Sequence, residues 1–374
     1  MDFAFNEEQK MLRDSARNFL KSECPKTVIG ELEESEKGYS PKLWKKMAQL
    51  DWMSIIVPEA YNGMGWSLLD LAVLFEEFGR AAMPGPMFAT VMGTLAILEG
   101  GTEEQKQKFL PEVVSGKLIL TLAMEEPDAV YDPKYVSAPA TGNNDGYVIN
   151  GTKLFVPYAH VADYLLVVAR TAGAPGDEKG ITLFAVDAKS PGINLTPVKT
   201  IAADKQFQVD FDNVSVSSDD VLGNPGEGIS MVRSVLEKAA AIQCAEAAGG
   251  AQQELEMTAK YTKEREQFDR PIGTFQAVQH RLADMYIDAR AARWTTYQAV
   301  WRLSEGMPAS RELAIAKAIT SKACQRVAFS AQQLHGGIGV DMDYDLHFYY
   351  RRAKAFELKF GTPSFHLEAL GAEI

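Results

Sequence analysis

Cysteine is scarce in this sequence, and its spacing excludes the common metal and redox motifs. The three cysteines, Cys24, Cys244 and Cys324, lie far apart along the 374 residues and form no Cys-x-x-Cys pair. An isolated cysteine in such a setting is usually a small apolar side chain inside the protein. We therefore expect all three to be buried.

Long apolar runs are missing too. No stretch reaches the roughly 18 apolar residues that a membrane-spanning helix needs. Residues 1–8 turn acidic at once, whereas a signal peptide starts with basic residues and continues with an apolar run. These features predict a cytoplasmic protein that does not insert into a membrane.

Positive charge is in short supply, and several catalytic signatures are missing. Lys and Arg total 38 against 50 Asp and Glu, which gives a net charge of −12. Nucleic-acid binding needs basic patches, so we do not expect it. The chain has no Gly-x-Gly-x-x-Gly after a strand, no Walker loop, no His-Glu-x-x-His and no Gly-x-Ser-x-Gly. Nucleotide hydrolysis, metal chemistry and serine hydrolysis therefore lose support.

The residues that are present divide the chain into three parts. Residues 1–116 have helical spacing, with Asn6 as a first cap and a capping box that starts at Thr102. From 117 to 225 short β-like runs alternate with turns such as residues 143–146, and helical spacing returns from 226 to 374. We expect an α+β fold with an N-terminal helical domain, a central antiparallel β-barrel or sandwich, and a C-terminal four-helix bundle.

Four segments carry a resemblance to a known family. The most specific runs are residues 260–278, which contain the sequence Arg-Glu-Gln-Phe, and residues 333–339, which read Gln-Leu-His-Gly-Gly-Ile-Gly. Residues 55–66 and 211–216 add two weaker matches in the same order. With these motifs in this order and at this spacing, the chain resembles the acyl-CoA dehydrogenases over essentially its whole length.

The resemblance implies an FAD-dependent enzyme that removes hydrogens from the α and β carbons of an acyl-CoA. It also implies FAD bound between the subunits of a homo- or heterotetramer or a dimer, with an electron-transfer flavoprotein as electron acceptor. The guanidinium of Arg265 suits a pyrophosphate, which it can pair with through two hydrogen bonds. The side chains placed near FAD by the resemblance are Arg265, Phe268, Ile272, Gln276, Gln333, Leu334, Gly336, Gly337 and Thr362, and in the β domain Leu122, Met124, Glu125, Phe155 and Pro157.

The chain departs from the family at the base that removes the α proton. The usual glutamate before a Gly-Thr pair is Phe360 here, and the second base position of the family is Ala239, next to Ala240 where many members have arginine. The flavin-facing threonine becomes Glu125, and the usual Gly-Ala-Gly-Ser-Asp loop is replaced by residues 128–132. Neither of the two usual base positions carries a carboxylate.

Two carboxylates could replace the missing base. Glu246 lies on the same helical face as Ala239 and Gln243, a stripe that starts apolar and should face the core. Glu125 is the second candidate because the resemblance places it beside the flavin. Either residue could instead be structural, Glu246 in an ion pair and Glu125 in a loop or cap. The leading hypothesis is dehydrogenation of a bulky or cyclic acyl-CoA; the alternatives are a base-less subunit of a heteromeric dehydrogenase and a lyase such as a desulfinase.

Overall fold

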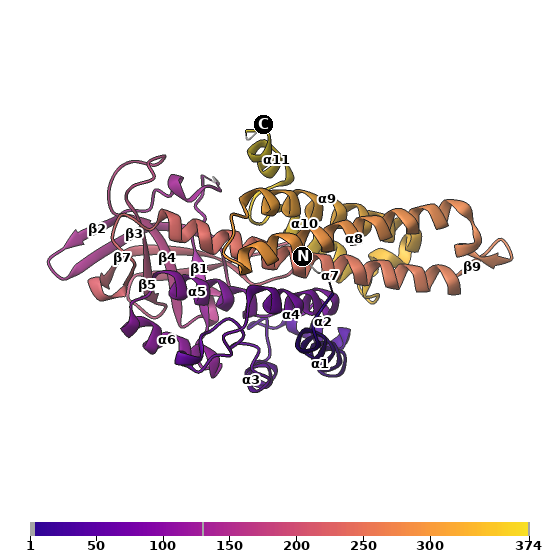
Figure 1. Ribbon diagram of the computed structural model, residues 1–374, viewed down its shortest axis with the longest axis horizontal. Coiled ribbons are helices and arrows are strands. Elements are labelled where there is room, and N and C mark those ends of the chain that lie inside the picture. The colour runs from indigo at the N-terminus through magenta and orange to yellow at the C-terminus, as the bar shows by residue number, and fades with distance from the viewer. Residues whose placement is uncertain (1–3, 129–130, 373–374) are drawn as a thin grey trace. The chain divides into compact units, whose positions relative to one another are not determined.

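The computed structural model describes residues 4–128 and 131–372 (Figure 1). The chain divides into two compact units. The helical unit comprises Met1–Gly30, Ser67–Met83 and Ala240–Ile374, and the mixed unit comprises Glu31–Trp66 and Pro84–Ala239. The division into domains at residues 116 and 225 stays a prediction.

The helical unit is built on a core of long helices. A cluster of buried apolar side chains, including Leu255, Met285 and Val327, joins α7, α8 and α9. Asn6 caps the first helix through a capping box with Gln9, as the sequence predicts. The helices in this unit are α1 (Glu7–Glu23), α4 (Leu68–Ala81), α7 (Ile229–Glu264) from Ala240 onward, α8 (Gln276–Ser304), α9 (Ser310–His335), α10 (Leu346–Leu358) and α11 (Pro363–Gly371).

The backbones of α4 and α7 touch at two glycines. A Cβ atom on Gly79 would lie 1.7 Å from the carbonyl oxygen of Glu246, and one on Gly249 would lie 1.9 Å from that of Glu76. No side chain fits in such a gap. The two glycines therefore allow the backbone of α4 to come into direct contact with that of α7.

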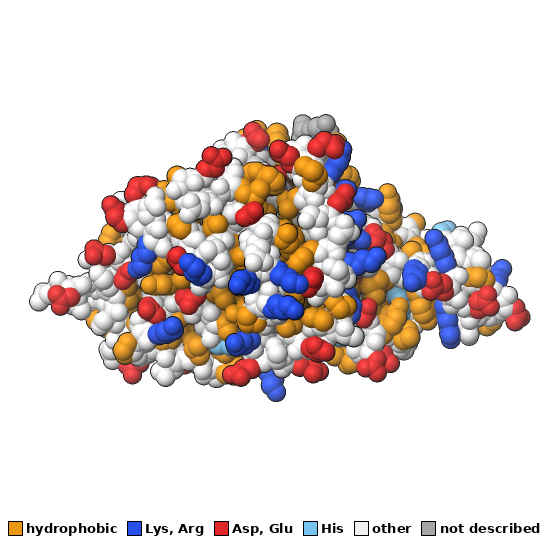
Figure 2. All heavy atoms as spheres, turned by 90° about the horizontal axis from the view of Figure 1, so that it is seen from below, with side chains coloured by type: hydrophobic (Ala, Val, Ile, Leu, Met, Phe, Trp, Pro, Cys, Tyr) orange, Lys and Arg blue, Asp and Glu red, His pale blue; other side chains and the backbone are white. Residues whose placement is uncertain are grey.

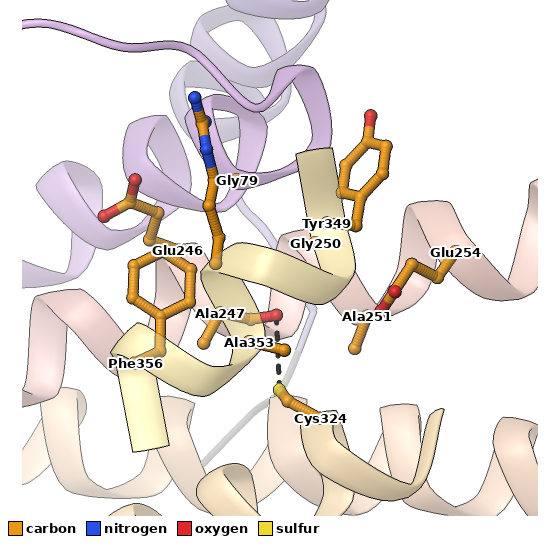
Figure 3. A pocket seen from close by; sticks show the side chains of 11 residues that line it. Gly79, Glu246, Ala247, Gly250, Ala251, Glu254, Cys324, Tyr349, Ala353 and Phe356 are labelled. Atoms are coloured by element: carbon orange, nitrogen blue, oxygen red, sulfur yellow. Dashed lines mark hydrogen bonds between the residues drawn. The ribbon is translucent and has the colours of Figure 1, made fainter. Parts of the chain in front are cut away.

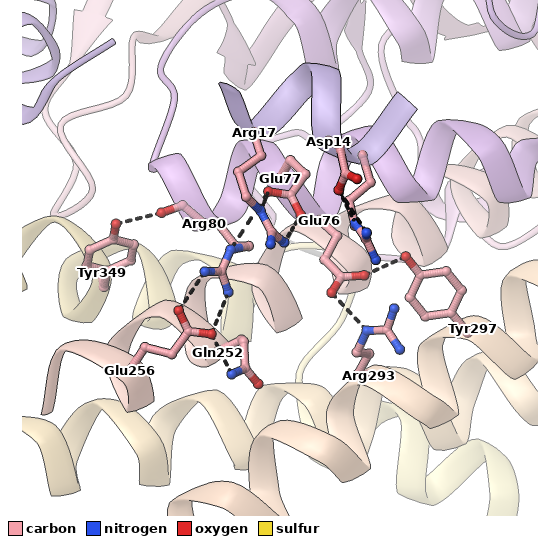
Figure 4. A network of polar contacts seen from close by, with 11 residues as sticks. Asp14, Arg17, Glu76, Glu77, Arg80, Gln252, Glu256, Arg293, Tyr297 and Tyr349 are labelled. Carbon is pink, nitrogen blue, oxygen red and sulfur yellow. Dashed lines mark hydrogen bonds and ion pairs between the residues drawn. The ribbon is translucent and has the colours of Figure 1, made fainter. Parts of the chain in front are cut away.

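Buried glutamates of α4 tie the same unit together through ion pairs (Figure 4). Glu77, 2% exposed, accepts hydrogen bonds from the guanidinium of Arg17 at 2.6 and 2.9 Å. Glu76 accepts from Arg293 at 2.8 Å and from the hydroxyl of Tyr297 at 2.5 Å. Because a buried carboxylate is costly unless it is paired, these contacts account for the two adjacent glutamates of α4 as structural groups.

The mixed unit contains two four-stranded sheets. The strand orders are β1-β4-β5-β8 and β2-β3-β7-β6, and all pairs except the parallel pair β1–β4 are antiparallel. The strands are β1 (Leu120–Ala123), β2 (Ala140–Asn143), β3 (Gly146–Pro157), β4 (Tyr164–Arg170), β5 (Ile181–Asp187), β6 (Ile193–Val198), β7 (Gln206–Ser217) and β8 (Val221–Leu222). Its helices are α3 (Pro41–Gln49), α5 (Met87–Gly100), α6 (Glu103–Val114), the end of α2 (Lys26–Glu34) from Glu31 onward and the start of α7 up to Ala239.

The predicted α+β architecture is confirmed, with one correction to the β part. The described strands of the mixed unit pair into two separate open sheets. The term sandwich therefore describes this part better than the term barrel. The hairpin turn expected at residues 143–146 joins β2 to β3. Residues 147–149 and 154–156 belong to a single strand, β3, whose register with β7 shifts twice.

The cysteines follow the sequence-based expectation. Cys24, Cys244 and Cys324 are all buried free thiols. Figure 2 shows Lys and Arg side chains interspersed with Asp and Glu on the face it presents. Within residues 4–128 and 131–372, no helix is long and apolar enough to cross a membrane. The same residues contain no group of three His, Cys, Asp or Glu side chains placed to hold a metal ion.

Candidate active site

The usual base position holds a buried aromatic ring in a strained turn. Phe360 is 6% exposed and adopts a left-handed backbone with φ of +56°, which is uncommon for a large side chain. The ring of His366 donates from Nε2 to the Phe360 carbonyl oxygen at 2.8 Å. A phenyl ring cannot accept a proton, so this turn retains a defined shape but lacks the function of a base.

The side chain of Lys317 fixes the helix that leads into this turn. Lys317 is 1% exposed, and its Nζ donates to the Phe356 carbonyl oxygen at 2.8 Å and to Ser321 Oγ at 3.0 Å. Burial lowers the pKa of its ammonium group. A cation that caps the last carbonyls of a helix is favourable because the helix dipole is negative there.

The second base position is also buried and apolar. Ala239 is fully buried and Ala240 is 2% exposed, so neither position offers a polar group. The predicted stripe on α7 is otherwise as expected. Val232, Leu236 and Gln243 are buried along it, and Glu246 at its end is half-buried.

Glu246 lines a small cavity inside the helical unit (Figure 3). The cavity measures about 10 Å³, which is close to the space of one water molecule. An acyl chain does not fit there, so a substrate could reach Glu246 only along the exposed part of its side chain. The other lining side chains include Glu254, Cys324 and Tyr349.

Glu254 is a group that the sequence did not single out. Its side chain is 1% exposed, and its Oε1 has no hydrogen-bond partner among the residues that the structure describes. Burial raises the pKa of this carboxyl well above its usual range, so the neutral acid is favoured. A glutamate in the middle of a helix is ordinarily a surface residue, and no sequence signal marks this one as different.

The five residues predicted near the flavin in the β domain all lie at one end of β1 and β3. Leu122 and Met124 are buried, and Pro157 is also buried. Glu125 is half-buried directly after β1, and its carbonyl oxygen accepts from the Leu154 amide at 2.8 Å. The strands therefore bring the segments around residues 124 and 155 together.

Phe155 is the most unusual residue of that group. It sits where the β3–β7 register shifts between Lys153 and Val156, with φ of +50° and 48% of its surface exposed. An exposed aromatic side chain on a strained bulge is rarely kept for packing alone, because bulges and strain concentrate at functional sites. Phe155 thus suits the role of an apolar shelf for a flat ring.

The predicted cofactor residues of the helical unit gather at helix ends. Arg265 follows α7 and is exposed, and Phe268 is 86% exposed in the hairpin of β9 (Glu266–Gln267) and β10 (Arg270–Pro271). Ile272 and Gln276 stand at the start of α8. Gln333, Leu334 and Thr362 lie near the end of α9 and at the N-cap of α11.

The glycine segment after α9 fits a phosphate-bearing cofactor. Gly336 has φ of +66°, and a Cβ atom on Gly336 or Gly337 would meet no heavy atom within 4 Å among the described residues. Open backbone of this kind lets a ligand approach closely. Together with the exposed guanidinium of Arg265, it fits the diphosphate of FAD in chemistry and accessibility.

Comparison with known proteins matches these features. The acyl-CoA dehydrogenase N-terminal, middle and C-terminal domain families match residues 6–117, 121–214 and 226–374. The caffeyl-CoA reductase-Etf complex subunit CarC of Acetobacterium woodii is 30% identical over 96% of both chains. A variant of the Tcur3481-Tcur3483 steroid ACAD is 36% identical, with a TM-score of 0.89 over 98% of this chain and 97% of that one. The ChsE4-ChsE5 complex of Mycobacterium tuberculosis is 31% identical, with a TM-score of 0.92 over 100% and 98%.

Fold and sequence together define a helix–sheet–helix enzyme that binds a flavin. The chain belongs to the acyl-CoA dehydrogenase family. It is accordingly an FAD-dependent oxidoreductase of acyl-CoA dehydrogenase type, as the resemblance implied.

Proposed function

We propose that this protein takes part in the α,β-desaturation of a bulky or cyclic acyl-CoA thioester. When bound, FAD supplies the acceptor for the hydride that leaves the β carbon. The protein must hold the thioester, exclude water and provide a carboxylate for the α proton. The Tcur3481-Tcur3483 relative is named a steroid ACAD, which supports a bulky ring system.

The observation that carries this proposal is Phe360 together with its surroundings. The turn has a defined backbone and a hydrogen bond from His366, while the phenyl ring offers no group that could accept the proton. Proton abstraction therefore requires another carboxylate. In this chain, Glu246 on the inner face of α7 and Glu125 after β1 are the two we propose, with Glu246 first.

A second candidate function is that of a base-less subunit in a heteromeric dehydrogenase. Phe360 and Ala239 favour it because both usual base positions are apolar and buried. Two of the compared structures are named as pairs of different chains. In that case the chain would contribute cofactor-binding residues such as Arg265 to a tetramer or dimer formed through the C-terminal helices, and the partner would provide the base.

The remaining proposals concern the surroundings of the enzyme. An electron-transfer flavoprotein would reoxidise the flavin. The CarC relative is named as a subunit of a complex with Etf, which supports such a partner. A cytoplasmic location agrees with the composition and remains our proposal. The cofactor positions named above are likewise proposed from the family resemblance.

Anaerobic flavin reduction by the purified chain separates the two functions. If Glu246 is the base, Glu246→Gln should retain FAD and slow flavin reduction by an acyl-CoA by roughly 10²–10⁴-fold. Glu125→Gln tests the second carboxylate in the same assay, and Glu368→Gln, an exposed residue of α11, is the matched control. A wild-type chain that binds FAD but is reduced only after a second subunit is added would instead establish the base-less role.

A further inference from the structure

A fully buried lysine lies directly beneath the segment that carries Glu125. Lys153 in β3 has no exposed surface, and its Nζ donates to the Met124 carbonyl oxygen at 3.1 Å and to Glu126 Oε1 at 2.7 Å. With the Leu154 amide bound to the Glu125 carbonyl oxygen, each residue from 124 to 126 is held from β3. The position of Glu125 is thereby set from its two neighbours as well as from its own backbone.

The carboxylate of Glu126 extends this arrangement to the other end of the substituted loop. Its Oε1 also accepts from the Ala138 amide at 2.9 Å, and its Oε2 accepts from the amide and the hydroxyl of Ser137, both at 2.7 Å. Arg170 nearby donates to the carbonyl oxygen of Val136 at 2.7 Å. One side chain therefore joins residue 126 directly to residues 137 and 138.

The same lysine borders the strained residue Phe155. The left-handed φ of Phe155 costs of the order of 1–3 kcal/mol and persists only when the surroundings fix it. Lys153 stands at the start of the register shift and anchors that side of it. A buried ion pair is rarely worth its desolvation for stability alone, which points to a role in holding a specific geometry.

We propose that Lys153 is a positioning residue that, through Glu126, holds Glu125, the backbone at Ser137 and Ala138, and Phe155 in one fixed arrangement. This inference rests on the proposed function only where it assigns Glu125 and Phe155 to the site. The geometric part stands apart from catalysis. It can be measured without FAD and without substrate.

The test is amide hydrogen exchange in Lys153→Met. We expect the Ser137, Ala138 and Leu154 amides to exchange at least roughly tenfold faster than in the wild type, because the Glu126 carboxylate, which accepts from the first two, and the Glu125 carbonyl oxygen, which accepts from Leu154, lose a fixed position. Amides of the β4–β5 ladder, such as that of Val168, should be unchanged. Lys189→Met, an exposed lysine of the same unit, is the matched control and should leave all of these amides as they are.

A second variant keeps the test decisive if the first one folds poorly. Lys153→Met combined with Glu126→Gln removes both charges, so no unpaired buried carboxylate remains, and it should fold and still show faster exchange at Leu154. FAD titration then tests the proposed flavin site itself. We expect the absorption band of the bound flavin in either variant to differ from that in the wild type. Unchanged exchange at all three amides in a folded variant would overturn the inference, whatever the enzyme activity.

Discussion

Phe360 combines a defined backbone shape with a side chain that cannot accept a proton. Its left-handed φ is unfavourable for a large side chain. The neighbouring contacts of Lys317 and His366 maintain the turn. The turn is therefore well fixed, but it offers no proton acceptor at the position where the family resemblance implies one.

Glu254 should make stability depend on pH. Its folded pKa is raised by burial, so its contribution to the free energy of unfolding is fully present below its unfolded pKa of about 4.3 and falls as the pH rises toward the folded pKa. Glu254→Gln removes the ionisable carboxyl, so the variant should not show this loss of stability with rising pH. Urea unfolding should show the variant gaining stability relative to the wild type between pH 4 and pH 8, by about 1.4 kcal/mol for each pKa unit crossed.

The control for that measurement is Glu368→Gln, because Glu368 is exposed on α11. Its stability relative to the wild type should stay level over the same pH range. A level difference for Glu254→Gln as well would mean that the Glu254 carboxyl ionises in the folded protein as it does in the unfolded one.

Lys153 is expected to titrate within reach of ordinary buffers. Burial lowers the pKa of its ammonium to about 8, although Glu126 opposes the shift. Because the unfolded lysine holds its proton up to about pH 10.4, the free energy of unfolding should rise with pH between about 8 and 10.4 from this group. Lys153→Met should abolish that rise in urea unfolding curves recorded at pH 7.5, 9 and 10, while Lys189→Met should keep it.

At the scale of elements, the crossing of α4 and α7 depends on two glycines. Gly79→Ala or Gly249→Ala would place a methyl group against backbone, and overpacking of this kind costs roughly 1–3 kcal/mol. Gly250→Ala on the same helix meets only ordinary contacts at 3.7 and 3.8 Å, and it should gain up to about 1 kcal/mol from helix propensity. Thermal unfolding should therefore shift in opposite directions for neighbouring glycines, and a common direction would argue against a backbone contact.

The end of α7 should determine how tightly FAD is held. If Arg265 pairs with the diphosphate, Arg265→Ala should weaken FAD binding by about 1.5–3 kcal/mol in a fluorescence titration. Lys263→Ala, an exposed cation two residues earlier, provides the comparison and should change the affinity little. Equal losses for both variants would indicate a general effect of charge instead of a specific pair.

Elements with a local signal were predictable from the sequence. Asn6 and Thr102 mark helix starts through side-chain hydrogen bonds that need only three residues. Strand β6 (Ile193–Val198) carries a weaker signal because it is short, largely exposed and contains a proline at position 197. Helix α5 (Met87–Gly100) is buried around most of its surface, so no polar face marks its period.

The site was predictable only in part, for the same physical reason. The positions of Arg265 and Gly336 follow from motifs, while the strain of Phe155 and the pairing of Lys153 with Glu126 depend on the register between distant strands. That register is a tertiary property which the sequence alone does not display. The choice between a sandwich and a barrel stayed open for this reason as well, because the pairing of sheet edges is not encoded in any one strand, and the two sheets of the mixed unit are open.

At the scale of the whole molecule, the reactivity of the buried cysteines can report unfolding of the native protein. Burial raises the pKa of the Cys244 thiol to about 11, and Cys24 and Cys324 are hidden as well. A thiol reagent can therefore modify the chain only when a unit opens. Cys244 and Cys324 lie in the same helical unit as Arg265 and Gln333, so the rate of their labelling with and without FAD would measure how often that unit opens in the native protein.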